Sequence, residues 1–374
     1  MRALEIYAGP AARQSLLRNG LAPAHVRTIA AAAGGPKGLM LGPLDRFVFG
    51  HWLAQSRHSI DLVGASIGAW RMATACLSDQ HAAFERLEHD YIHQHYTPEP
   101  GTKRLTAERV SETFSKSLTA FFEGHINEVL DHARYRLHIV TSRGRHLLRT
   151  EHPVRTPLGY MGAFLTNALH RKSLGVWLER VVFSASDAEQ RGGQSVRRTA
   201  TLPFAMEDFP TRQVPLDAGN FKQALQASCS IPFVLRSVRD IAGAPEGAYW
   251  DGGITDYHLH LNYAAAAQRD TRPHIVLYPH FQRSVVPGWL DKGLKWRHRS
   301  TAFLDNVVLL APNPEWVKTL PNGKLPDRHD FTHYGNDLAG RVKAWSTAVA
   351  ASAQLAEEFA QWLHRPDLSR IQAL

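Results

Sequence analysis

The sequence predicts an α/β fold in three layers, with a mainly parallel central sheet covered by helices on both faces. Two short apolar runs, residues 26–33 and 59–65, each lead into a glycine-containing turn. Each turn is followed by apolar residues at helical spacing, over residues 39–55 and 67–77. Strand, turn and helix in this repeated order are typical of parallel βα units.

The rest of the chain adds helices and further strands to this core. A polar, helical insertion is expected at about residues 81–134, broken at 98–101, and a long amphipathic helix at 341–363. Residues 190–198 and 312–328 have the glycine, proline and charge content of loops. Further strands are expected at residues 135–141, 180–183, 199–204, 248–250 and 274–278. We expect a core over residues 1–280 and a C-terminal extension over 281–374, packed on the core.

Composition narrows the function classes. The 374 residues are 44% hydrophobic and 21% charged, which excludes a disordered or fibrous chain. A net charge of +9 favours anionic partners such as lipid head groups or nucleic acid. Two cysteines, Cys76 and Cys229, exclude a disulfide scaffold and a four-cysteine zinc site, and suit a reducing compartment.

No signal peptide or membrane-spanning segment is predicted. The first ten residues contain Glu5 and lack a continuous apolar region. The longest uncharged apolar stretches, residues 160–169 and 344–356, fall short of the roughly 18–20 residues needed to cross a bilayer. We therefore expect a cytoplasmic protein that meets membranes from outside.

The most specific motif is Gly64-Ala65-Ser66-Ile67-Gly68, between a predicted strand and a predicted helix. This is the context of a nucleophile elbow, in which a serine sits on a strained turn. Gly64 and Gly68 remove side chains that would collide with the crossing strand and helix. Ser66 is then presented near the N-terminus of a helix, where negative charge is favoured. A tight turn that only packs the helix on the strand is the alternative.

A second motif, Gly34-Gly35-Pro36-Lys37-Gly38, lies one βα unit upstream and should emerge beside the elbow. Glycines let the backbone approach a ligand and direct N–H groups at it, as an oxyanion hole requires. Pro36 has no N–H, so we expect the donors to be the amides of Gly34, Gly35 and Lys37. The spacing departs from that of phosphate-binding loops, which disfavours that alternative.

A third motif, Asp251-Gly252-Gly253, follows a short apolar strand. Asp-Gly-Gly is by itself an ordinary turn sequence. A serine nucleophile needs a base, however, and the carboxyl edge of a parallel sheet is where a carboxylate could meet it.

Together with Ala-Ser-Cys-Ser-Ile-Pro at 227–232, these motifs resemble the patatin-like phospholipases in order and spacing, over residues 26–256. The resemblance implies a patatin-type α/β fold with a Ser–Asp dyad and no catalytic histidine. It also implies hydrolysis of acyl esters, typically phospholipids, lysophospholipids or neutral acylglycerols, without a cofactor or metal.

Residue by residue, the resemblance makes Ser66 the nucleophile and Asp251 the base, and places the glycine-rich residues at 34–38 in the oxyanion loop. Two departures from the family pattern stand in that loop: Ala33 replaces the first of three glycines, and Pro36 occupies the variable position.

Other histidines and cysteines offer alternative chemistry. A Ser-His-Asp triad would place its histidine after the aspartate, and three residues qualify by order: His258, His260 and His280. A helical metal site would use His89, His93 and His95, although solvated histidines on a helix fit better. Both cysteines are expected to be buried packing residues.

Residues 289–299 interleave tryptophan and leucine with basic residues. This pattern suits peripheral contact with an anionic membrane, and residues 285–300 could form a lid. The alternatives are a basic loop with its tryptophans turned inward, or a groove for single-stranded nucleic acid. A non-catalytic membrane- or nucleic-acid-binding module is the rival hypothesis. The intact motifs favour the enzyme acting on a lipid ester, and no nucleic-acid partner is expected.

Overall fold

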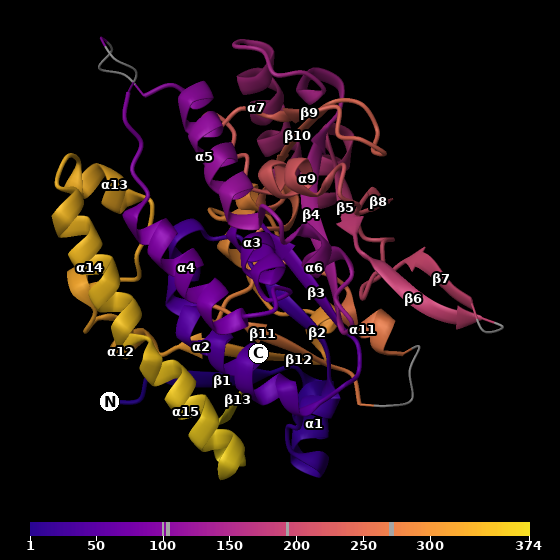
Figure 1. Ribbon diagram of the computed structural model, residues 1–374, viewed down its shortest axis with the longest axis vertical. Helices are drawn as coiled ribbons and strands as arrows, with labels where there is room; N and C mark the ends of the chain where they lie inside the picture. Colours follow the sequence, from indigo (N-terminus) through magenta and orange to yellow (C-terminus); the bar gives the residue numbers. More distant parts are fainter. Residues whose placement is uncertain (99–100, 102–104, 192–193, 269–272) are drawn as a thin grey trace.

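The computed structural model describes residues 1–98, 101, 105–191, 194–268 and 273–374. It is an α/β fold built on a mixed, mostly parallel central sheet (Figure 1). The main path of the sheet runs β13-β1-β12-β11-β2-β3-β4-β10-β9, and β5 and β8 extend it beyond β4. The strands are β1 (Leu4–Ala8), β2 (Val26–Ala31), β3 (Ile60–Ala65), β4 (Tyr135–Gly144), β5 (Leu178–Ser184), β8 (Thr211–Pro215), β9 (Val238–Arg239), β10 (Ala248–Asp251), β11 (Ile275–Pro279), β12 (Val307–Pro312) and β13 (Ile371–Ala373).

The predicted βαβα order is present at the centre of the sheet. β2 and β3 pair in parallel, and β3 pairs in parallel with β4. Most of the connection from β2 to β3 is helical, as η2 (Gly35–Leu41), α2 (Gly42–Phe47), η3 (Val48–Trp52) and η4 (Leu53–Gln55). Helix α3 (Ile67–Thr74) follows β3 after the single residue Ser66.

Each face of the sheet packs on its own apolar core. Leu62 and Leu137 share a core with residues of the larger helices. Figure 1 shows these helices over one face of the sheet. These helices are α2, α3, α4 (Gln80–His93), α5 (Ala107–Phe122), α9 (Phe221–Ser228), α14 (Leu338–Ala351) and α15 (Ala353–His364). Val63, the residue after Leu62, and Val140, three residues after Leu137, pack with Leu259 and Tyr278 on the other face. This alternation buries β3 and β4 on both sides, as expected for parallel strands.

The remaining helices are shorter or lie near the edges. They are α1 (Pro10–Asn19), α6 (Ile126–Leu130), α7 (Arg155–Leu169), α8 (Leu174–Trp177), α10 (Gly253–Asp256), α11 (Tyr263–Ala267), α12 (Pro314–Val317) and α13 (His329–Tyr334), with short 3₁₀ turns η1 (Pro23–His25), η5 (His146–Leu148), η6 (Arg171–Ser173), η7 (Trp289–Asp291), η8 (Lys295–Arg297), η9 (Ala302–Leu304), η10 (Pro321–Gly323) and η11 (Leu368–Arg370). The insertion expected at 81–134 corresponds to α4, α5 and α6. Of its predicted break at 98–101, residues 99 and 100 lie outside the described residues.

Two local predictions were wrong. The loop expected at residues 190–198 is largely a hairpin of β6 (Ser186–Arg191) and β7 (Gln194–Thr199), with residues 192 and 193 outside the described part. Its strands are too polar to show hydrophobic alternation. The strand expected at 199–204 is irregular, because Leu202 and Phe204 are buried against the sheet face without joining the ladder.

The C-terminal region also differs from expectation. The helix expected at 341–363 is two helices, α14 and α15, which meet at Ser352. The loop expected at 312–328 contains α12 and η10. Residues 281–374, expected to form an extension, also supply β12 and β13, so this region completes the central sheet. Among the described residues, no helix combines the length and apolar character needed to span a membrane.

Candidate active site

Two strands approach each other end to end along one edge of β4. β3 runs parallel to β4, and its last residue, Ala65, lies opposite Val140. β10 runs antiparallel to β4, and its last residue, Asp251, lies opposite Thr141. β5 occupies the other edge of β4. The residue after β3 is Ser66, so the topology brings the predicted nucleophile and the predicted base to one point.

The elbow at Ser66 has a strained backbone. Ser66 has φ +56° and ψ −130°, a conformation that residues with a side chain rarely adopt. A Cβ at Gly64 would lie 2.4 Å from Ala69 Cα, and one at Gly68 would lie 1.9 Å from the carbonyl oxygen of Ala31. Both positions therefore require glycine, which is the reason given for the motif from the sequence.

The side chains of Ser66 and Asp251 are in direct contact. Ser66 Oγ donates a hydrogen bond to Asp251 Oδ2 at 2.7 Å, and the residues are 4% and 6% exposed. The amide of Gly253 donates to Asp251 Oδ1 at 2.7 Å, so both carboxylate oxygens are held. A Cβ at Gly252 would lie 2.0 Å from the carbonyl oxygen of Val140, which explains the glycine next to the aspartate.

Burial changes the acidity of Asp251. Removal from water raises the pKa of this carboxyl above its ordinary value, against the opposing effects of the Ser66 hydrogen bond and the Arg328 guanidinium. A carboxylate with a raised pKa is a stronger base than an aspartate in water. It is therefore better suited to take a proton from a hydroxyl group.

Residues 227–232 hold the elbow from the other side. The amide of Ser66 donates to Ser228 Oγ at 2.9 Å, and Ser228 Oγ donates to the carbonyl oxygen of Val140 at 2.7 Å. The amide of Gly252 donates to the carbonyl oxygen of Ser228 at 3.1 Å. Ser228 thus ties both catalytic candidates to β4, a role that its sequence context did not reveal.

Cys229, the next residue, lies at the wall of the same site. Burial raises the pKa of its thiol well above the ordinary value, which keeps it protonated. Cys76 is buried after α3 and its thiol contacts the carbonyl oxygen of Met72. Both cysteines are buried, as predicted.

The glycine-rich loop passes directly beside Ser66. Gly34 lines a cleft together with Ser66 and Asp251, and Gly35 lines a second cavity together with Ser66. In a 3₁₀-helix that starts at Gly35, the first N–H groups have no partner within the helix, whereas the amide of Lys37 is used by it. Since Pro36 has no N–H, Gly34 and Gly35 are the available donors.

The other residues of this loop set its position. A Cβ at Gly38 would lie 3.0 Å from Ile67, so Gly38 allows the loop to pack closely on the start of α3. The amide of Ala33 donates to the carbonyl oxygen of Tyr257 at 3.0 Å. A Cβ at Gly253 would lie 2.7 Å from the Cβ of Ala33, which brings the loop and the aspartate turn together.

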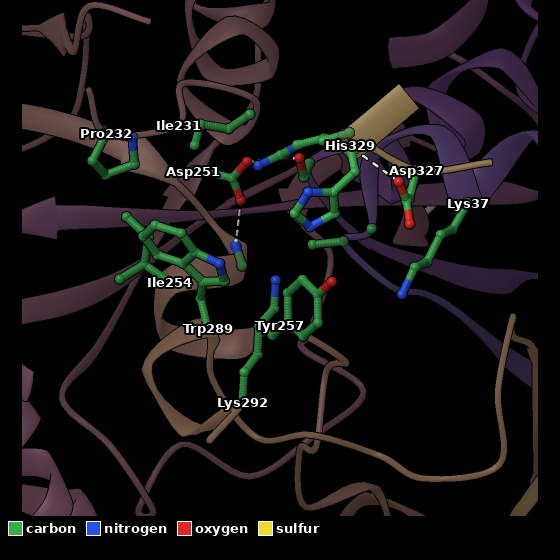
Figure 2. Close-up of a pocket in the computed structure, with 15 residues that line it drawn as sticks. Lys37, Ile231, Pro232, Asp251, Ile254, Tyr257, Trp289, Lys292, Asp327 and His329 are labelled. Atoms are coloured by element: carbon green, nitrogen blue, oxygen red, sulfur yellow. Dashed lines mark hydrogen bonds between the residues drawn. The ribbon is translucent and has the colours of Figure 1, made fainter. Parts of the chain in front are cut away.

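Two cavities of different character meet at Ser66. The first is a cleft of about 400 Å³ whose lining includes the cations Lys37, Lys292 and Arg328. Figure 2 shows Lys37, Lys292 and Asp251 pointing into this cleft from different elements. The second, of about 520 Å³, has mainly apolar walls from α3, α4, α5 and the C-terminal region. Its apolar and aromatic lining includes Trp70, Tyr91, Val110, Phe114, Leu235 and Phe331.

The C-terminal third therefore contributes to the site, which the motifs did not indicate. Lys292 follows η7, and Arg328 precedes α13 and lines both cavities. A Cβ at Gly35 would lie 3.2 Å from Arg328 Nε, so this arginine lies over the glycine-rich loop. The stretch around Arg328 is polar and contains proline, and nothing in it pointed to this role.

The alternative histidines make their hydrogen bonds elsewhere. His258 contacts the carbonyl oxygen of Ser284 at 3.1 Å, His280 that of Gln282 at 2.5 Å, and His260 contacts Thr301 Oγ1 at 3.2 Å. None of the three lines the cleft or the apolar cavity at Ser66. The direct Ser66–Asp251 contact leaves no place for a histidine between them.

The histidines of α4 also make other contacts. The rings of His89 and His93 stack at 4.2 Å on the exposed surface. His95 lines the apolar cavity. Within the described residues, no group of three or more His, Cys, Asp or Glu side chains is arranged to hold a metal ion.

The basic and aromatic segment at 289–299 is partly built into the fold. Asp291 is buried and accepts hydrogen bonds from Asn167 at 2.8 Å, Arg171 at 2.7 Å and Arg297 at 2.8 Å. Trp289 lines the cleft, whereas Trp296 is 65% exposed. This anchoring disfavours a lid over 285–300 and leaves only the Trp296 region facing outward.

No protein-family model matches the chain, and a search of curated proteins finds no match either. The resemblance to the patatin-like phospholipases therefore remains a prediction based on motifs. The functional argument depends on the geometry of the site.

Proposed function

We propose that the protein is a serine acyl-ester hydrolase of the patatin-like type, acting on lipid esters with Ser66 and Asp251 as a catalytic dyad. The single observation that carries this proposal is the 2.7 Å hydrogen bond from Ser66 Oγ to the buried Asp251 carboxylate, whose other oxygen accepts a hydrogen bond from the amide of Gly253. Nucleophile and base within hydrogen-bond reach are the signature of covalent catalysis. The strained elbow and the adjacent glycine amides support the same chemistry.

The mechanism uses only groups of this chain. Asp251 takes the proton of Ser66 Oγ while Oγ attacks the ester carbonyl, and the amides of Gly34 and Gly35 stabilise the oxyanion. The tetrahedral species collapses to an acyl-serine, and the leaving alkoxide takes the proton from Asp251. Water then attacks the acyl-serine with Asp251 as the base. This second step releases the fatty acid and restores Ser66.

The apolar cavity supports a lipid as the acyl donor. It opens at Ser66, and Ile67, Trp70 and Phe114 are among its walls. A fatty acyl chain placed there would have its carbonyl carbon at Ser66 Oγ. Burial of such a chain would stabilise the complex by about 0.8 kcal/mol per methylene group.

Helix α7 supports peripheral contact with a lipid surface. Val154, Leu158, Met161, Leu165 and Leu169 recur at helical spacing and are 48–88% exposed. An unpartnered apolar stripe of this length is unusual for a surface helix and marks an interaction site. We infer that this stripe, rather than the anchored segment at 289–299, is the main membrane-contacting surface of a cytoplasmic protein.

Helix α7 is linked to the wall of the apolar cavity through its buried face. Tyr160 of α7 is 6% exposed, and its ring centre lies 5.8 Å from that of Phe233, which is 60% exposed. The neighbouring Val234 lines the apolar cavity. The helix that carries the exposed stripe is therefore packed against a segment of the cavity wall.

The proposal is tested with a serine-directed fluorophosphonate probe and a chromogenic acyl ester. We expect Ser66→Ala to abolish labelling, since among the described residues Ser66 is the serine whose hydroxyl donates to the Asp251 carboxylate. Asp251→Asn should lower kcat for the ester by roughly 10²–10⁴-fold, the usual contribution of a general base. Both variants should keep the wild-type circular dichroism spectrum. Wild-type protein that the probe does not label, or an Asp251→Asn variant with near-normal kcat, would favour the non-catalytic basic module.

A further inference from the structure

Three cations share the cleft on the leaving-group side of Ser66. Lys37 comes from η2, Lys292 from the turn after η7 and Arg328 from the turn before α13. Within the described part of the chain, none of these side chains forms a salt bridge or donates a hydrogen bond. Lys37 Nζ lies 5.2 Å from the ring centre of Phe281, and Lys292 Nζ lies 4.0 Å from that of Tyr257.

The acidic groups of the cleft neutralise these cations only in part. Asp251 is engaged with Ser66 and Gly253. Asp327 accepts from Lys324 at 2.8 Å and from the amide of His329 at 2.9 Å. Three positive charges thus face two carboxylates, each already engaged.

The cations also act on one another. Lys292 reaches the solvent at the cleft wall, but protein atoms surround much of its side chain. This partial burial and the nearby charges of Arg328 and Lys37 lower the pKa of Lys292 to about 8. Burial lowers the pKa of Lys37 as well. Asp327 acts against this repulsion at Lys37 and Asp251 at Lys292, but two carboxylates offset three cations only in part, and an anion bound between the cations would lower the remaining repulsion.

The two cavities at Ser66 indicate how an ester substrate would be oriented. Arg328 and Ile231 line both the apolar cavity and the cationic cleft, and Ser66 lies where the two meet. An acyl chain in the apolar cavity leaves the alcohol part of the ester facing the cleft. The chemistry of the cleft therefore selects the alcohol.

We propose that the substrate is an acyl ester whose alcohol carries a phosphate monoester, bound by Lys37, Lys292 and Arg328. A phosphate monoester carries a charge of about −1.5 to −2 at pH 7 and offers three acceptor oxygens, which suits two lysines and one arginine. The quaternary ammonium of a phosphocholine head group would instead lie near three positive charges. This inference rests on the proposed acyl-ester hydrolysis and specifies its substrate class.

Binding is measured first, so that the result does not depend on catalysis. The probe is glycerol 3-phosphate, titrated into the Ser66→Ala variant by calorimetry, with glycerol and inorganic phosphate as separate arms. We expect glycerol 3-phosphate to bind and glycerol not to bind. Arg328→Met and Lys292→Met, each added to Ser66→Ala, should raise Kd at least tenfold. Lys222→Met is the matched control, because Lys222 is exposed on α9 and lines neither cavity.

Selectivity is measured next with monomeric substrates that share one acyl chain. These are 1-acylglycerol 3-phosphate, 1-monoacylglycerol and the lysophosphatidylcholine of the same chain. We expect kcat/KM of the wild type to be at least tenfold higher for the phosphate monoester, and Arg328→Met and Lys292→Met to reduce this ratio about tenfold. Lys222→Met should leave the ratio unchanged.

The outcomes separate the two proposals. Probe labelling and ester hydrolysis with no preference for the phosphate monoester overturn this inference and leave the proposed function standing. Binding of inorganic phosphate as tight as that of glycerol 3-phosphate would show a free-anion site and overturn the assignment of the alcohol. Absence of both labelling and hydrolysis refutes the proposed function, whatever the binding result.

Discussion

The conformation of Ser66 is imposed by three neighbouring groups. Its φ of +56° is unfavourable for serine, and such strain persists only where the surroundings determine it. The amide of Ser66 is held by Ser228 Oγ and its hydroxyl by Asp251 Oδ2. Gly68 allows α3 to approach Ala31 closely. The strain is therefore the physical consequence of presenting Oγ to Asp251 and to both cavities at once.

The raised pKa of Asp251 predicts where the acid limb of the pH–rate profile lies. Asp251 acts as a base only when ionised, so kcat/KM for a neutral soluble ester should fall as pH drops through its pKa. Because burial raises this pKa, the limb should lie above the ordinary value of 3.8. The charged neighbours that oppose this rise are Arg328 and, more weakly, Lys292.

A pH–rate profile measures this limb in the wild type and in Arg328→Met. Removing the guanidinium should move the limb to higher pH, since one cation that favours the carboxylate is lost. A limb at or below pH 3.8, or one that stays in place in Arg328→Met, would contradict the assignment of Asp251 as the base.

Sequence reasoning at this scale found the dyad but not its supports. Ser66, Asp251 and their flanking glycines were predictable because each glycine satisfies a local backbone requirement. Ser228, Lys292 and Arg328 were not assigned these roles from the sequence. Each acts through a contact set by the fold, such as the 2.9 Å hydrogen bond from the Ser66 amide to Ser228 Oγ, which joins residues 162 positions apart.

At the scale of elements, buried parallel strands were easier to predict than elements at edges. β2 and β3 are mostly apolar and each leads into a glycine-containing turn, which gives a strong local signal. The β6–β7 hairpin and helix α7 were missed for opposite reasons. The hairpin has too few apolar residues, whereas α7 carries apolar residues on its exposed face as well as its buried one.

The exposed stripe of α7 predicts a measurable membrane affinity. Arg155 and Lys172, both exposed, lie at the two ends of the helix and would meet anionic head groups. The triple substitution Leu158→Gln, Met161→Gln and Leu165→Gln removes the centre of the stripe and keeps residues of good helix propensity. We expect its partition coefficient on anionic vesicles to fall at least about tenfold, from the loss of apolar burial.

Co-sedimentation with vesicles of phosphatidylglycerol and phosphatidylcholine measures this effect. Leu17→Gln is the matched control, because Leu17 is 53% exposed but lies on α1, away from the site. Fluorophosphonate labelling of each variant reports that the site is intact. Equal binding by the triple variant and the wild type would show that α7 is not the contacting surface.

At the scale of the whole molecule, the proposed catalytic pair depends on a sheet whose last strands come from the C-terminal part of the chain. β12 pairs with β11 on one side and with β1 on the other, so it joins the N-terminal strand to the core. The sequence motifs end near residue 256, which is why we expected residues 281–374 to be an extension packed on the core. Strand order between distant segments is set by the packing of the whole chain and has no local signal in residues 307–312.

This topology predicts that a fragment of residues 1–280 does not fold by itself. Val307, Val308, Leu309 and Leu310 are fully buried, and loss of four such side chains removes roughly 6–12 kcal/mol, comparable with the whole stability of a typical domain. Loss of β12 and β13 also leaves β1 without a partner strand. We expect the fragment to show no cooperative thermal transition by circular dichroism and no fluorophosphonate labelling.

A fragment of residues 1–366, which lacks only η11 and the edge strand β13, should melt cooperatively at a moderately lower temperature than the full chain. A folded, labelled 1–280 fragment would instead mean that the catalytic core is independent of β12, and that Lys292 and Arg328 belong to a removable accessory to it.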